Sequence, residues 1–122
     1  MNFHSIKRIK YWIQASRIET LPLSISGIIV GSFYAFYNYS FDKIIFVLSI
    51  ITAISFQILS NFANDYGDGV LGTDNNRIGP KRVIASGKLT LEELKKGIIV
   101  NVFISITLSY SCLLYTSPSP RD

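Results

Sequence analysis

The stretch from Ile44 to Asp68, IIFVLSIITAISFQILSNFANDYGD, decides the fold. Its first part, up to Asn64, holds no charged residue. A helix that crosses a bilayer needs about 20 consecutive apolar residues, so this run is long enough to span one. Two more uncharged runs flank it, Thr20 to Phe41 on one side and a run that begins at Gly97 on the other. The pattern predicts three membrane-spanning helices.

The composition supports a membrane location. Hydrophobic residues make up 48% of the 122 residues and charged residues only 16%, whereas a soluble domain carries about 25% charged residues. Three such helices leave too little chain for a soluble globule around them. A cleavable signal peptide is disfavoured because bulky aromatic residues gather at 33–39, where small residues are required. We expect an all-α, polytopic transmembrane helix bundle with spans at 20–41, 44–66 and 94–111.

The basic residues predict how the chain is oriented. Four precede the first span, six lie in the 65–96 loop, and only Lys43 lies in the short connection between the first two spans. The positive-inside rule then places the N-terminus and the 65–96 loop in the cytoplasm, with the protein in the cell (inner or plasma) membrane. Residues 1–19 form a basic segment in which Ile6, Ile9 and Ile13 have helical spacing and Trp12 suits the headgroup level. The net charge is +4. We expect membrane lipid as a partner and no nucleic acid partner.

The last eleven residues, CLLYTSPSPRD at 112–122, interrupt the third apolar run. All eleven match an in-frame translation of a transposase adapter used in preparing sequencing libraries, and such segments are set aside before the fold is considered. We therefore predict that residues 1–111 are the N-terminal part of a longer domain and that 112–122 are not natural protein. The alternative is a genuine Pro-rich tail. Cys112, the one cysteine, lies in this segment and supports no redox argument.

A polar stripe interrupts the end of the second span. Positions 57, 61, 64, 65 and 68 share one face of a helix, and they hold Gln57, Asn61, Asn64, Asp65 and Asp68. Ionisable groups at the membrane edge are costly and usually line a functional cavity. The stripe therefore predicts a site.

The charges in and after this stripe are typical of a metal-bound polyphosphate site. Asp65 and Asp68 lie one turn apart, and Mg²⁺ takes one or two carboxylates together with substrate phosphates. Gly67, Gly69 and Gly72 would let the chain fold back and bring Asp74 to the same ion. Three basic residues that suit phosphate oxygens follow: Arg77, Lys81 and Arg82. A solvated turn is the alternative, while the spacing excludes an EF-hand calcium loop and a P-loop.

The string NFANDYGDGVLGTDNNRIGPKR, together with the earlier Arg17-x-x-Thr20-Leu21-Pro22 step, resembles the UbiA-type intramembrane prenyltransferases. The branch that it resembles most prenylates 1,4-dihydroxy-2-naphthoate in menaquinone biosynthesis. The resemblance extends from Tyr11 to Ser111. One departure concerns the third acid, which the general family pattern places at the position of Gly72 and which here falls at Asp74.

The resemblance implies a Mg²⁺-dependent transfer of a polyprenyl group from polyprenyl diphosphate to 1,4-dihydroxy-2-naphthoate, giving demethylmenaquinone. It implies Asp65 and Asp68 as catalytic residues and, with Asp74, as metal ligands. The diphosphate would contact five residues: Asn61, Asn64, Arg77, Lys81 and Arg82. Such enzymes have further helices and a second Asp-rich motif, so the chain by itself is expected to be inactive. The alternatives are another aromatic acceptor (4-hydroxybenzoate, haem or chlorophyllide), or a non-enzymatic small membrane protein with a cation-binding loop.

Overall fold

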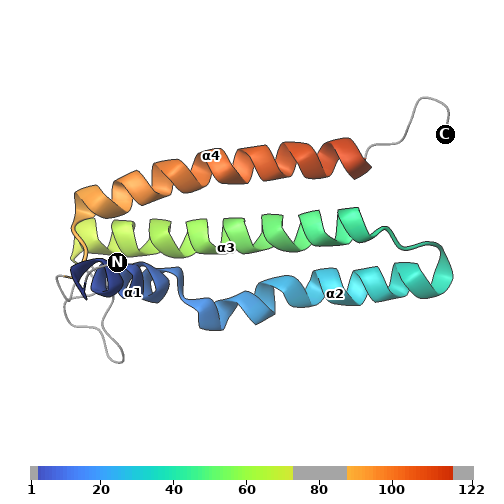
Figure 1. Ribbon diagram of the computed structural model, residues 1–122, viewed down its shortest axis with the longest axis horizontal. Helices are drawn as coiled ribbons and strands as arrows, with labels where there is room; N and C mark the ends of the chain where they lie inside the picture. Colours follow the sequence, from blue (N-terminus) through green and yellow to red (C-terminus); the bar gives the residue numbers. More distant parts are fainter. Residues whose placement is uncertain (1–2, 73–87, 117–122) are drawn as a thin grey trace.

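The computed structural model describes residues 3–72 and 88–116, and every regular element in them is helical (Figure 1). In order these are α1 (Phe3–Ser16), the 3₁₀ turn η1 (Ile18–Thr20), α2 (Leu21–Asn38), α3 (Lys43–Leu71) and α4 (Leu91–Thr116). The predicted all-α class is confirmed. Three helical stretches are long and apolar enough to cross a membrane: His4–Asn38, Lys43–Leu71 and Leu91–Thr116.

Local sequence explains where the spans begin. Pro22 lies in the first turn of α2, where its missing N–H is not needed. Asp42 caps α3, because its Oδ1 accepts hydrogen bonds from the backbone N–H groups of Ile44 at 2.8 Å and Ile45 at 3.2 Å. Thr90 does the same for α4, accepting from the N–H of Glu93 at 3.1 Å. Helix α2 ends at Asn38 and α3 begins at Lys43, which confirms the predicted tight connection between the first two spans.

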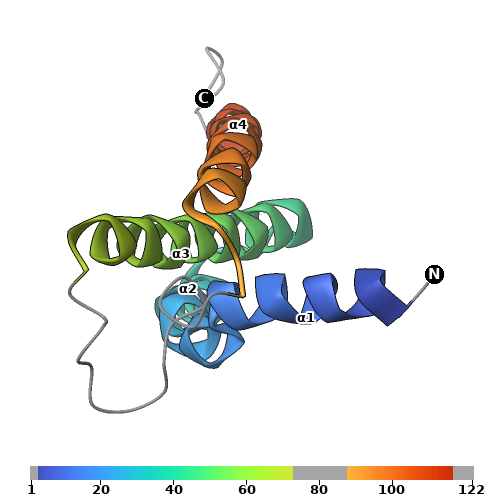
Figure 2. The same ribbon diagram turned by 90° about the vertical axis from the view of Figure 1, so that its left-hand side faces the viewer.

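The first apolar stretch is not one straight helix. Arg17, between α1 and η1, has φ 49° and ψ 66°, a left-handed conformation that ends α1. Figure 2 shows the result: α2 is seen nearly end-on while α1 is seen from the side, so α1 runs across the end of the bundle. The membrane-crossing part of this stretch is therefore α2.

The predicted helical placement of the polar stripe through Asp68 is confirmed, but the predicted end of the second span, near residue 66, is too early. Helix α3 continues to Leu71, so Asp65 and Asp68 are helical, as are Gly67 and Gly69. A glycine inside a helix costs about 1 kcal/mol, which a long packed helix tolerates. The helix ends where Gly72 takes φ 73°, a conformation that suits glycine. Similarly, α4 begins at Leu91 and continues through Thr116, beyond both ends of the predicted third span.

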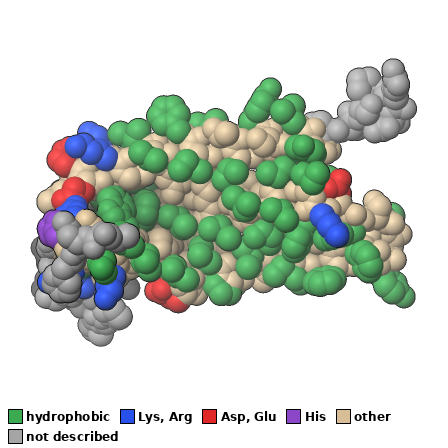
Figure 3. Space-filling view, viewed as in Figure 1, with side chains coloured by type: hydrophobic (Ala, Val, Ile, Leu, Met, Phe, Trp, Pro, Cys, Tyr) green, Lys and Arg blue, Asp and Glu red, His purple; other side chains and the backbone are tan. Residues whose placement is uncertain are grey.

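The bundle is held by a small core at one end and by polar contacts along its length. Four buried apolar residues form the core: Ala15, Phe62, Leu89 and Leu94. Farther along, the hydroxyls of Ser55 and Ser105 share a hydrogen bond of 2.6 Å, and both lie within hydrogen-bond distance of Oδ1 of Asn101, joining α3 to α4. Hydrophobic side chains cover much of the face in Figure 3, while charged groups gather at the end that holds α1. An apolar exterior of this kind suits lipid.

Candidate active site

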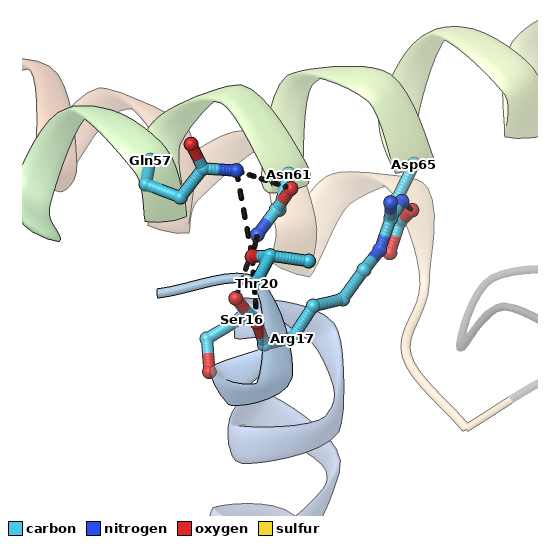
Figure 4. A network of polar contacts seen from close by, with 6 residues as sticks. All are labelled: Ser16, Arg17, Thr20, Gln57, Asn61 and Asp65. Atoms are coloured by element: carbon cyan, nitrogen blue, oxygen red, sulfur yellow. Dashed lines mark hydrogen bonds and ion pairs between the residues drawn. The ribbon is translucent and has the colours of Figure 1, made fainter. Parts of the chain in front are cut away.

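The polar stripe of α3 faces the bend between α1 and α2. Asn61, which is 3% exposed, donates through Nδ2 to the carbonyl oxygen of Ser16 at 2.8 Å and to Oγ1 of Thr20 at 3.1 Å (Figure 4). Gln57 lies one turn earlier, with Nε2 directed at Thr20 and at Asn61, and its Oε1 accepts from the hydroxyl of Ser24 at 2.6 Å. These bonds satisfy the amides inside an apolar setting and fix the bend against α3.

Asp65 continues this stripe by one more turn and pairs with Arg17. The carboxylate is 2% exposed, and its Oδ1 forms an ion pair with the guanidinium of Arg17, whose side chain is 22% exposed. Figure 4 shows Arg17 reaching along α3 from the bend to Asp65. A buried carboxylate stays ionised only when it is paired and hydrogen-bonded. Arg17 therefore supports a charged Asp65 at this end of the bundle.

The structure brings together part of the predicted site. Asp65 and Asp68 lie three residues apart in α3, Asp65 buried and Asp68 half-buried. Asn61 lies on the predicted face, where its side chain binds Ser16 and Thr20 and so holds the bend in place. Asn64 is exposed. The other predicted residues lie outside the described residues: Asp74, Arg77, Lys81 and Arg82.

The described part of the site fits Mg²⁺ to a limited degree. Among residues 3–72 and 88–116, no group of three or more His, Cys, Asp or Glu side chains could hold a metal ion. However, Mg²⁺ often binds through one or two carboxylates plus substrate phosphates, and Asp65 and Asp68 supply two. Pairing with Arg17 does not by itself saturate Asp65, because a carboxylate offers about four lone-pair positions. The two residues could thus hold the ion jointly with a diphosphate.

A separate apolar groove of about 680 Å³ lies between α3 and α4. Its walls include Ile54, Ile58, Val100 and Ile104, and Arg8 and Glu93 stand among its charged residues. Asp65 and Asp68 are not among its lining residues. The groove and the carboxylates are therefore two distinct features of this end of the chain.

Two curated bacterial proteins match most of the chain, and both are named 1,4-dihydroxy-2-naphthoate octaprenyltransferase. The one from Escherichia coli (strain K12) is 43% identical over 105 residues, which are 85% of this chain and 34% of the relative. The one from Haemophilus influenzae is 41% identical over 111 residues, 88% of this chain and 36% of the relative. The chain is a homologue of these prenyltransferases. The resemblance to prenyltransferases of this name, inferred from the Asp-rich string, is confirmed.

A third protein of the same name, from Mycobacterium leprae, is 29% identical over 107 residues. The chain spans about a third of the length of the curated relatives that it matches. No family model matches the chain, and no solved structure matches it.

Arg17 is the contact that the sequence analysis missed. Its place in the Arg17-x-x-Thr20-Leu21-Pro22 step contributed to the family resemblance, but no role followed from it. The only signal was a cation placed directly before a membrane span, where basic residues are common for reasons of topology. Its partner lies 48 residues away in sequence, and a bend between two helices brings them together.

Proposed function

We propose that the protein containing this chain transfers a polyprenyl group from polyprenyl diphosphate to 1,4-dihydroxy-2-naphthoate, releasing diphosphate and CO₂ and giving demethylmenaquinone in its reduced, quinol form. The observation that carries the proposal is the pair Asp65 and Asp68 near the end of a membrane-spanning helix, in a chain that is 41–43% identical to enzymes of that name. In the whole protein, this pair of carboxylates would serve the prenyl transfer reaction.

In this proposal Asp65 and Asp68, with Asp74, would hold Mg²⁺, and the bound ion would supply positive charge beside the diphosphate. The residues of the chain then have separate tasks. Arg17 would orient Asp65 through their ion pair. Asn64 and three basic residues, Arg77, Lys81 and Arg82, would contact diphosphate oxygens, with Asn61 as a further predicted contact.

The transfer itself needs a site from which water is excluded. As the allylic C–O bond breaks, the electron pair leaves with the diphosphate and a prenyl cation remains. The electron-rich aromatic ring of the acceptor attacks that cation, losing its carboxylate in the naphthoate case. The apolar helices of the bundle would shield the cation from water until the new C–C bond has formed.

The test is an assay of the full-length protein with polyprenyl diphosphate, Mg²⁺ and either 1,4-dihydroxy-2-naphthoate or 4-hydroxybenzoate. We expect product only with the naphthoate. Asp65→Ala and Asp68→Ala should each nearly abolish turnover, because one lost ligand leaves the metal-bound diphosphate poorly held. Asp74→Ala should reduce it by less because its position departs from the family pattern. Arg77→Ala and Lys81→Ala should mainly raise KM for the diphosphate.

Three outcomes would separate the alternatives. Preferred use of 4-hydroxybenzoate would overturn the acceptor assignment but not the site. Wild-type turnover by Asp65→Ala would overturn the site. Binding of Mn²⁺, followed by electron paramagnetic resonance with and without prenyl diphosphate, gives a readout independent of turnover. Tight Mn²⁺ binding without any prenyl transfer would favour a non-enzymatic membrane protein with a cation site.

A further inference from the structure

Helix α1 has two different long faces. One face packs on the bundle: Ala15 is 1% exposed, the ring of Trp12 meets that of Phe62 edge-on at 5.5 Å between centroids, and Arg8 forms an ion pair with Glu93. The other face carries Ile6, Ile9 and Ile13, which are 42%, 45% and 49% exposed. These three follow i, i+3, i+7 spacing, so they form one apolar stripe along the helix.

The position of α1 relative to the spans places this stripe at the end of the bundle. The spans α2, α3 and α4 fix the direction of the membrane normal, and α1 lies across their end (Figures 1 and 2). That end is also where charged side chains gather, as expected at a bilayer surface (Figure 3). A helix placed there and lying in the membrane plane has one side toward the acyl chains and one toward water.

The charges beside the stripe match one kind of surface. Lys7 and Lys10 are both exposed. Lys10 lies beside Ile6 and Ile13 on the helix, and Lys7 lies farther round, on the polar side. A helix with an apolar stripe and lysines on its polar side is typical of segments that lie in the headgroup region of anionic bilayers. Within α1 itself there is no acidic residue to oppose such a surface.

We propose that α1 is an interfacial helix that inserts Ile6, Ile9 and Ile13 into the membrane surface and places Lys7 and Lys10 against anionic phospholipid headgroups. The proposal does not depend on the enzymatic activity. Because α1 contacts Phe62 and Glu93, the depth of α1 in the bilayer would be linked to the depth of the bundle. Each lysine near an anionic surface contributes about 1 kcal/mol, so two lysines shift the equilibrium between inserted and raised α1 by about thirtyfold.

Spin labels on the 122-residue chain test this in vesicles. In a Cys112→Ser background, Ile9→Cys places a label on the stripe, and His4→Cys places one on an exposed position of the same helix outside the stripe. We expect the label at residue 9 to be relaxed several-fold more by oxygen than by a water-soluble nickel chelate, and the label at residue 4 to show the reverse. Equal exposure of both labels to the nickel chelate would overturn the proposal. Protection of residue 9 from both reagents, the sign of a protein partner, would also overturn it.

The lipid charge is tested by comparing vesicles of phosphatidylcholine alone with vesicles that contain about 30% phosphatidylglycerol. The residue 9 label should lie deeper in the anionic vesicles, and Lys7→Gln with Lys10→Gln should abolish that difference. The matched control, Lys95→Gln with Lys96→Gln, removes the same charge from the start of α4 at the same end of the bundle and should keep the difference. If the two double variants behave alike, specific recognition by α1 is refuted.

Discussion

Gly97 is a position where adding one methyl group should change how α1 is held. A Cβ at this position would lie 2.6 Å from both Cη2 and Cζ3 of Trp12, where ordinary contact begins near 3.4 Å. The indole has no flexible end that could move aside, and Phe62 packs against it. In Gly97→Ala, therefore, Trp12 has to shift, and α1 with it.

The magnitude follows from two opposing terms. Overpacking a fitted contact costs about 1–3 kcal/mol, while replacing glycine by alanine inside a helix contributes about 1 kcal/mol of stability. The net change for Gly97→Ala is thus a destabilisation of about 0–2 kcal/mol. Gly31→Ala is the matched control, because nothing lies within 4 Å of the Cβ that it adds to α2. It should show the helical gain alone, so the two variants should differ by about 1–3 kcal/mol.

The assay uses Trp12 as its own reporter, since it is the only tryptophan in the chain. Purified chain in detergent micelles should show a longer-wavelength emission maximum and a lower Tm in Gly97→Ala than in Gly31→Ala. Introducing Trp12→Ala should remove most of the cost of Gly97→Ala, because the two changes act on one contact. Equal Tm values for the two glycine variants, with unchanged emission, would refute the packing of α1 on α4.

Three further predictions concern the ion pair, the topology and the end of the chain. Arg17→Gln removes the guanidinium beside the buried Asp65 and should lower the free energy of unfolding by about 3 kcal/mol or somewhat less, since breaking a buried pair costs about 3–5 kcal/mol and Arg17 is partly exposed. Adding Asp65→Asn should recover part of this loss in thermal unfolding. No recovery would argue against the ion pair. A cysteine at Asn76 should be labelled only from the cytoplasmic side of intact cells, and labelling from outside would reverse the topology. Amplifying the genomic locus across the codon of Ser111 should give a reading frame that continues into further apolar helices, and finding CLLYTSPSPRD in the genome would contradict the adapter assignment.

The sequence was sufficient for the features that depend on local composition. Uncharged runs of membrane length predict spanning helices directly, because the bilayer requires internal hydrogen bonding. The amphipathic spacing at Ile6, Ile9 and Ile13 likewise anticipated α1. The error at the end of α3 arose because Gly67 and Gly69 near aspartates are typical of turns, yet helical continuity overrode that local preference as far as Gly72.

The pairing of Arg17 with Asp65 could not be predicted from local sequence, because it depends on the tertiary fold. Neither residue specifies the other through spacing; the contact exists because Arg17 adopts a left-handed conformation and turns α1 across the bundle. That bend is in turn fixed by Asn61, whose amide binds the Ser16 carbonyl and Thr20. The stripe that the sequence assigned to ligand binding thus does two things along one helix face. Its membrane-side amides build the bend, and the bend supplies the cation that allows Asp65 to stay charged where a metal-bound diphosphate would need it.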